Sequence, residues 1–310
     1  MIRRRIQQCL LRNLSTTTTA APKTSLRILV VDGYQEKSRE EFEKTGLPLA
    51  STLYSNMLRE QGLFDDIHLE FDTIFPCQKG FQMKDTNLED YDGACFTGSS
   101  MSAYSTDPDC TIQIEIMKDL FKRNISTFGS CWGIQIAAMA IGGNVELSPK
   151  GREVGIGRKV SVTESGKNHP MFRDKKNVFE AFMSHSDEVT TIPDSDVVEV
   201  LAGNDHSKVQ AMSVQHGDTE SWFVQYHPEY DLKYFAGLIS TRKKRMTDMG
   251  FFLKEDDIDL YVQELCDLHE NPELKHVKWK YGIDDDIMDT NIKRREVRNW
   301  LRYLRELKGE

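Results

Sequence analysis

Short apolar runs alternate with amphipathic segments along the first half of the chain. Each run has the length of a buried strand and is bounded by turn or charged residues; the runs are 26–32, 67–71, 91–97 and 124–128. Apolar residues recur at helical spacing in 47–61 and 111–122, and a further helix is expected over 134–141. This alternation predicts a doubly wound, mostly parallel α/β sheet covered on both faces.

The pattern changes after Gly142-Gly143. Turn residues then separate short strand-like segments with no helices between them; these segments are 154–162, 177–182, 197–202, 209–215 and 221–225. The second half of the domain is therefore expected to be rich in strands and partly antiparallel.

From Asp231 onward the chain is polar and helical. Three helices are expected near 232–239, 258–266 and 297–307, and the last carries many basic residues. These are Lys293, Arg294, Arg295, Arg298, Arg302 and Arg305. A solvated basic face is the leading interpretation of that run, and a docking surface for an acidic partner is the alternative. We therefore divide the chain into a tail (1–25), a domain (26–232) and a helical extension packed on the core (233–310).

Composition narrows the classes of protein. The 310 residues are 39% hydrophobic and 29% charged, and the net charge of −9 disfavours nonspecific nucleic-acid binding. No apolar run is long enough to span a membrane. The six cysteines form no CxxC pair, which favours a reducing compartment over a disulfide scaffold.

The first 25 residues differ from the rest of the chain. They are rich in arginine, serine and threonine, and the first acidic residue is Asp32. Arg-rich, acid-poor amphipathic starts are typical of mitochondrial transit peptides. We expect import into the mitochondrial matrix, and a disordered tail on a cytoplasmic protein is the alternative.

A cysteine stands where one predicted strand meets the following helix. Cys131 lies between Gly129 and Gly133 in the sequence Phe-Gly-Ser-Cys-Trp-Gly-Ile-Gln. Glycines permit a sharp turn and leave space around the sulfur, and unpaired amides at a helix start favour negative charge there. The pattern predicts a nucleophile elbow with cysteine in place of serine, although a lone cysteine at a helix start is more often structural.

A histidine and a glutamate follow the last predicted strand. Pro228 restricts His227 to extended geometry, and residues two apart in an extended segment project to the same side. Glu229 can then accept from one imidazole nitrogen while the other faces a thiol, which is the arrangement of nucleophile, base and orienting group. Alone, His-Pro-Glu is more often a turn.

Glycine also follows the strand over 91–97. A loop beginning at Gly98 can aim amides into the crevice at the carboxyl ends of the strands. Together with the amide of Trp132, it could stabilise a tetrahedral oxyanion. Gly-Ser-Ser alone is usually only a loop, but the three elements together, each at a strand end, favour a catalytic site.

These motifs resemble those of the class I (triad) glutamine amidotransferase family. The resemblance rests on residues 129–135 together with His227-Pro228-Glu229, and it extends over about residues 26–232. Residues 184–187 (Ser-His-Ser-Asp) also resemble the Ser-His-Gly-Asp segment of the amidotransferase part of GMP synthases. The family implies a flavodoxin-like fold that hydrolyses the side-chain amide of glutamine through a γ-glutamyl thioester and releases ammonia.

The resemblance also implies roles for individual residues. Cys131 would be the nucleophile, His227 the general base and then acid, and Glu229 the group that orients His227. Gly98 and Trp132 would supply the oxyanion-hole amides. Gln135, Ser184 and His185 would help to hold glutamine. The family implies no cofactor, and no histidine shows the spacing of a metal ligand, so no metal site is expected.

The chain departs from the family pattern at the oxyanion loop. The usual Gly-Gly-Pro is replaced by Gly98-Ser99-Ser100, as in stand-alone members that include γ-glutamyl peptide hydrolases. The chain also lacks a GxxxxGK loop and an ATP-pyrophosphatase loop, so ammonia would pass to a separate partner protein or be released. The alternatives are a γ-glutamyl peptide hydrolase and a non-catalytic partner-binding protein on the same scaffold.

Overall fold

The computed structural model describes residues 24–193 and 196–309. Residues 1–25, predicted to be a transit peptide or alternatively a disordered tail, therefore lie almost wholly outside the described residues. Among the residues that are described, no helix has the length and hydropathy that a membrane span requires.

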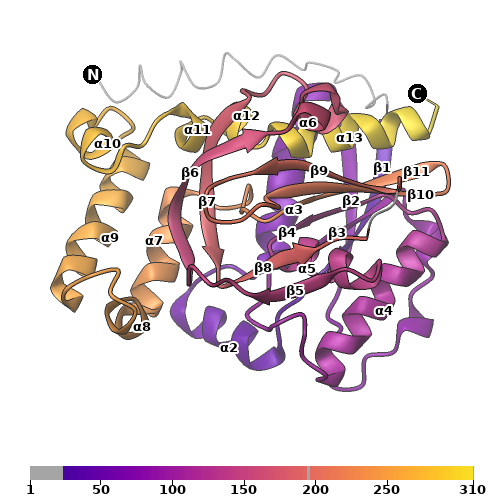
Figure 1. The fold of residues 1–310 in the computed structure, drawn as a ribbon, viewed down its shortest axis with the longest axis horizontal. Coiled ribbons are helices and arrows are strands. Elements are labelled where there is room, and N and C mark those ends of the chain that lie inside the picture. Colours follow the sequence, from indigo (N-terminus) through magenta and orange to yellow (C-terminus); the bar gives the residue numbers. More distant parts are fainter. Residues whose placement is uncertain (1–23, 194–195, 310) are drawn as a thin grey trace, which may run out of the picture.

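A nine-stranded mixed sheet organises the chain, in the order β2-β1-β3-β4-β11-β10-β9-β6-β7 (Figure 1). The first five strands pair in parallel: β2 (Ile67–Ile74), β1 (Thr24–Val31), β3 (Gly93–Phe96), β4 (Thr127–Ser130) and β11 (Thr219–Val224). The others pair antiparallel: β10 (Ala211–His216), β9 (Val198–Gly203), β6 (Glu153–Val162) and β7 (Val178–His185). The predicted fold class is confirmed, including the change to antiparallel pairing after residue 143.

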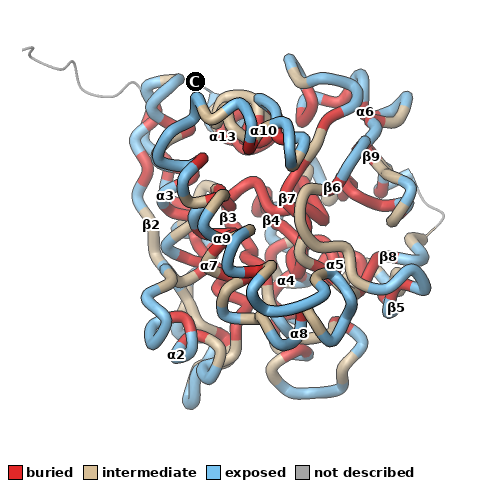
Figure 2. The backbone as a smooth tube through the Cα atoms, turned by 90° about the vertical axis from the view of Figure 1, so that its left-hand side faces the viewer, coloured by how far each residue is buried: buried red, intermediate tan, exposed pale blue. Residues whose placement is uncertain are grey.

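Helices cover both faces of the parallel part of the sheet. Leu26, Ile28 and Val30 of β1 pack against α3 (Ala50–Gly62) and α13 (Arg295–Leu307). Leu29 and Val31, which point to the opposite face because side chains alternate along a strand, pack against α4 (Pro108–Lys122) and α5 (Trp132–Ala140). Figure 2 shows buried residues along the inner strands and exposed residues on the outer helices.

A small second sheet lies beside α5. Its strands β5 (Asn144–Leu147) and β8 (Asp187–Thr191) pair antiparallel, and the sequence pattern did not predict them. Short helices complete this half of the chain. They are α6 (Glu164–Asn168) and the 3₁₀ turns Leu63–Asp65, Met83–Asp85, Leu88–Asp90 and Pro170–Phe172.

The polar helices gather beside β6 and β7 (Figure 1). A third apolar cluster joins them to that edge of the sheet. The helices of this group are α2 (Glu36–Thr45), α7 (Leu232–Thr241), α8 (Lys243–Asp248), α9 (Glu255–Glu270) and α10 (Lys275–Tyr281). Two short helices, α11 (Asp285–Met288) and α12 (Thr290–Lys293), then lead into α13.

The expectation of a solvated basic face over residues 293–305 is wrong for three of its members. Lys293, Arg294 and Arg298 are buried. The Arg298 guanidinium donates to the Gln61 side-chain oxygen at 2.9 Å, and burial lowers the pKa of Lys293 to about 7. The basic residues are buried because α13 lies against the sheet and α3, and carbonyl and amide oxygens there accept from the guanidiniums.

Candidate active site

The ends of three neighbouring strands bring the predicted motifs together. Phe96 of β3 pairs with Gly129 of β4, and Val224 of β11 pairs with Ser130 of β4. Since these strands run parallel, their carboxyl ends open onto the same edge of the sheet, where ligands bind in open α/β folds. The loop at Gly98, the turn at Cys131 and the segment after Val224 all begin at this edge.

Cys131 occupies a strained turn. Its φ is 52° and its ψ is −93°, a conformation that costs free energy in a residue other than glycine. The Cys131 N–H donates to the Val224 carbonyl at 2.8 Å, which fixes the turn to β11. A Cβ at Gly129 would lie 3.0 Å from the Gly133 Cα, and a Cβ at Gly133 would lie 3.1 Å from the Phe96 carbonyl oxygen, so glycine at both positions permits the close approach of α5 to the strands. The predicted elbow is thus present, with the sulfur at the start of α5.

His227 lies between Glu229 and the cysteine. Its Nδ1 is 2.6 Å from the Glu229 Oε1, and its Nε2 is buried with no hydrogen-bond partner among the described residues. Burial disfavours the charged ring, but the negative charges of Glu229 and of Cys131 outweigh this and raise the pKa of His227 to about 9. At neutral pH the ring is therefore an imidazolium whose Nε2 proton is available to a reacting group.

Three side chains that the motifs did not reveal hold this pair in place. Ser130 Oγ donates to both Glu229 oxygens, at 3.3 and 3.2 Å, and accepts from the Tyr54 hydroxyl. Tyr230 stacks on the His227 ring, with centroids 4.0 Å apart and an interplanar angle of 6°. Ser130 could have been suspected from its place beside Cys131, whereas nothing in the sequence connects Tyr54 with the site.

A cavity of about 240 Å³ opens beside the sulfur. Cys131, His227, Gln135, Ser184 and His185 all line it, so the structure unites the predicted nucleophile, base and glutamine-holding residues. Gln135 donates its amide N–H to the Asp187 carbonyl at 3.1 Å. Glu229 lies behind His227 and does not line the cavity.

The two residues predicted for the oxyanion hole lie next to the cavity but do not line it; Ser99 and Ser100 do. The Gly33 N–H donates to Thr97 Oγ1 at 2.9 Å, and that hydroxyl donates to the Gly98 carbonyl at 3.0 Å, so this loop is held in one orientation. A side chain at Gly98 would lie 3.2 Å from His227 Cε1. Glycine is therefore needed at this position for the close approach of the histidine.

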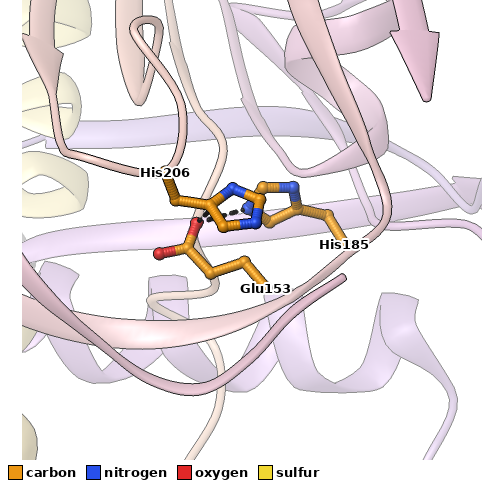
Figure 3. Close-up of side chains that lie close together, drawn as sticks. All are labelled: Glu153, His185 and His206. Carbon is orange, nitrogen blue, oxygen red and sulfur yellow. Dashed lines mark hydrogen bonds and ion pairs between the residues drawn. The ribbon is translucent and has the colours of Figure 1, made fainter. Parts of the chain in front are cut away.

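His185 lies in a cluster with Glu153 and His206, in which His206 Nδ1 is 3.6 Å from Glu153 Oε2 (Figure 3). The His185 Nε2 is 2.9 Å from Glu153 Oε2, and its Nδ1 is 3.0 Å from the Asp187 carbonyl. Ligand atoms of the three side chains lie within 4.8 Å of one another, a spacing that a metal ion could bridge. The side-chain amides of Gln210 (2.9 Å) and Asn204 (2.8 Å) already donate to the carboxylate. This network satisfies the Glu153 carboxylate and orients His185 at the cavity wall.

The C-terminal extension reaches the back of the site. Arg294 Nε donates to the Pro228 carbonyl at 3.0 Å. Glu296, which is fully buried, accepts from the Tyr226 hydroxyl and pairs with Lys175 at 2.7 Å. The segment that carries His227 and Glu229 is therefore fixed on both sides by residues just before and within α13.

The raised pKa of His227 predicts a pH-dependent stability. Histidine in an unfolded chain titrates near pH 6.5, so between pH 6.5 and about 9 the folded protein keeps a proton that the unfolded chain has released. The free energy of unfolding is expected to fall as the pH rises through this window. Urea unfolding of the wild type and of His227→Gln should show a shallower fall in the variant; parallel curves would contradict the assigned charge state.

Comparison with known proteins shows the family to which the chain belongs. The family model described as glutamine amidotransferase class-I matches residues 68–241, more than half of the chain. The protein belongs to the class I glutamine amidotransferase family.

Individual relatives differ in how much of their length they share. A γ-glutamyl-L-1-hydroxyisopropylamide hydrolase of Pseudomonas sp is 28% identical over 90% of this chain and 93% of its own length. γ-Glutamyl peptidase 4 of Arabidopsis thaliana is 28% identical over 62% of this chain and 72% of its own. A GMP synthase of Clostridium novyi is 33% identical over 46% of this chain, but the match spans only 25% of that enzyme.

Solved structures share the fold. A glutamine amidotransferase of Thermotoga maritima superposes with a TM-score of 0.56 at 18% identity, over 88% of this chain and 98% of its own. This supports the same doubly wound architecture.

Proposed function

We propose that the protein is a γ-glutamyl amide hydrolase whose nucleophile is Cys131. The observation that carries the proposal is the arrangement of three groups: the sulfur on its elbow and the unpartnered Nε2 of His227 meet at one cavity, and Glu229 lies behind the ring on its other nitrogen. This is the arrangement that covalent catalysis at an amide carbonyl requires.

The reaction would proceed in two displacements. The Cys131 sulfur attacks the γ-carbonyl carbon, and the His227 imidazolium gives its Nε2 proton to the leaving nitrogen as the carbon–nitrogen bond breaks. A γ-glutamyl thioester and a free amine, or ammonia from glutamine, result. Neutral His227 then takes a proton from water as the water oxygen attacks the thioester, and glutamate and the cysteine are released. Glu229 keeps the ring oriented and stabilises its charge.

Backbone amides would stabilise the oxyanion in both steps. We assign this role to the amides of the Gly98–Ser99 loop and of Trp132 at the start of α5, where the helix presents unpaired N–H groups. The hydrogen bonds that Thr97 Oγ1 makes with the Gly33 N–H and the Gly98 carbonyl hold this loop in one orientation. Preorganised stabilisation of an oxyanion requires such a fixed loop.

Water is the proposed acceptor of the γ-glutamyl group. The chain spans nearly the whole length of the Pseudomonas hydrolase but only a quarter of the GMP synthase. Glutamine and larger γ-glutamyl amides are the proposed substrates. Transfer of ammonia to a separate partner protein is the second candidate, favoured by the shared amidotransferase segment of the synthases. The mitochondrial matrix stays the proposed location, with the cytoplasm as the alternative.

Assays of glutamate release test the proposal. The purified protein is expected to release glutamate from glutamine and from N-substituted γ-glutamyl amides at a steady rate without ATP or an added protein. A folded protein that hydrolyses none of these compounds would contradict the function. Turnover of glutamine that appears only when cell extract is added would favour an ammonia-accepting partner.

A further inference from the structure

Three guanidinium groups line the cavity without ion-pair partners. Arg152, Arg242 and Arg245 all face the space that contains the Cys131 sulfur. Among residues 24–193 and 196–309, none of these three arginines has a carboxylate oxygen within 4.0 Å, the limit for an ion pair. Other arginines of the chain do form ion pairs. A group of unpaired cations at a substrate cavity favours an anionic ligand.

Arg152 is the most firmly held of the three. It donates to Ser184 Oγ at 2.9 Å and to Ser186 Oγ at 3.0 Å, while its Nε is buried without a partner. Burial, together with the charges of Arg242 and Arg245, lowers the pKa of Arg152 to about 10. The three cations are therefore close enough to repel one another, and an anion between them would relieve that repulsion.

A second cavity of about 500 Å³ adjoins the first. Tyr34, Ser100, Arg242 and Arg245 line both cavities, whereas Cys131 and Arg152 line only the first. Arg242 and Arg245 thus stand at the boundary between the space that holds the reacting carbonyl and a larger space beyond it. A substrate longer than glutamine can extend across this boundary.

The charge of the γ-glutamyl group does not account for three guanidiniums. Its α-carboxylate and α-ammonium cancel, and Arg152, which lies in the first cavity only, suffices for the carboxylate. The acidic residues that line the cavities, Asp187 and Glu41, lie beyond ion-pair distance of the arginines. The other end of the substrate, in the second cavity, can supply negative charge for Arg242 and Arg245.

We propose that Arg242 and Arg245 bind a carboxylate on the leaving amine, so that the preferred substrates are γ-glutamyl amino acids or peptides. The inference rests on the proposed γ-glutamyl hydrolysis and specifies its substrate class. Both arginines follow α7 and lie outside residues 68–241, the segment that matches the family model. They can therefore determine specificity without being part of the shared catalytic core. The hydroxyisopropylamide in the name of the Pseudomonas relative carries no carboxylate, so the two proteins would differ in the leaving group they accept.

Two matched substrates test the assignment. γ-Glutamylglycine and γ-glutamylglycinamide differ only in the charge of the leaving group. We expect kcat/KM to be about tenfold or more higher for the acid, which is the range of a charge-assisted hydrogen bond, and the KM of the acid to rise with salt. Arg245→Gln and Arg242→Gln should each reduce the ratio of the two kcat/KM values about tenfold, whereas a merely structural defect would lower both values and leave the ratio unchanged.

Lys243→Gln is the matched control. Lys243 lies between the two arginines in the chain but pairs with Asp259 and lines neither cavity, so it should keep the wild-type ratio. Equal efficiency on both substrates, or a ratio that both arginine variants leave unchanged, would overturn the inference while the hydrolase function stands. Failure to hydrolyse glutamine and both test compounds would instead contradict the proposed function itself.

Discussion

Replacing Cys131 with alanine is expected to lower γ-glutamyl hydrolysis by about 10⁴-fold or more, because the nucleophile of a covalent mechanism has no substitute in the cavity. The side chain is nearly buried and its loss removes one sulfur, so the fold should persist. Steady-state rates of glutamate release, with a circular dichroism spectrum of each protein, measure the effect. Substrate should still bind, because Gln135 and the arginines are untouched.

Cys266→Ala serves as the control for this substitution. Cys266 lies on α9, partly buried and outside the cavity, so its removal should leave turnover within about twofold of the wild type. Equal turnover by wild type and Cys131→Ala would mean that another group attacks the carbonyl. Such a result would remove the mechanistic assignment but not the family membership.

Replacing Glu296 with alanine is expected to reduce the free energy of unfolding by about 3–5 kcal/mol, the cost of leaving one partner of a buried ion pair without the other. The side chains of Lys175 and Glu296 are 3% and 0% exposed, and the Tyr226 hydroxyl also loses its acceptor. Tyr226 directly precedes His227, so kcat should fall as well. Urea unfolding measures the first effect and glutamate release the second.

Two variants separate this explanation from a general defect of α13. Glu306→Ala, on an exposed position of the same helix, should change stability by no more than about 0.5 kcal/mol. The double variant Lys175→Met with Glu296→Leu removes both charges and should regain much of the lost stability. A single Glu296→Ala protein as stable as the wild type would contradict the idea that α13 anchors the catalytic segment.

The parallel half of the fold was predictable because its strands are short, apolar and separated by helices. Buried strands at 26–32 and 67–71 correspond to β1 and β2, and the alternation of elements fixed the class. The site was predictable for a related reason, since Cys131 follows directly on β4, His227 lies three residues after the end of β11, and parallel strands end at one edge.

The remaining features depend on contacts between distant parts of the chain. β5 and β8 are short and half exposed, so neither has a clear hydrophobic pattern. In the sequence, Arg294 looks like an ordinary cation of a polar helix. In the fold it is buried, and the carbonyl of Pro228, 66 residues earlier in the chain, accepts a hydrogen bond from it. The arginines beside the cavity follow α7 and show no motif. A single sequence shows composition and the local periodicity of apolar residues. It does not show which charged residues find a hydrogen-bond acceptor after folding.

Affinity labelling with diazo-oxo-norleucine, a glutamine-like electrophile, tests the central claim most directly. The account predicts one label per chain on Cys131, located by peptide mass spectrometry, with loss of hydrolysis in proportion to labelling and protection by a γ-glutamyl substrate. Inactivation with the label on another residue, or full turnover by protein whose Cys131 is completely alkylated, would contradict it.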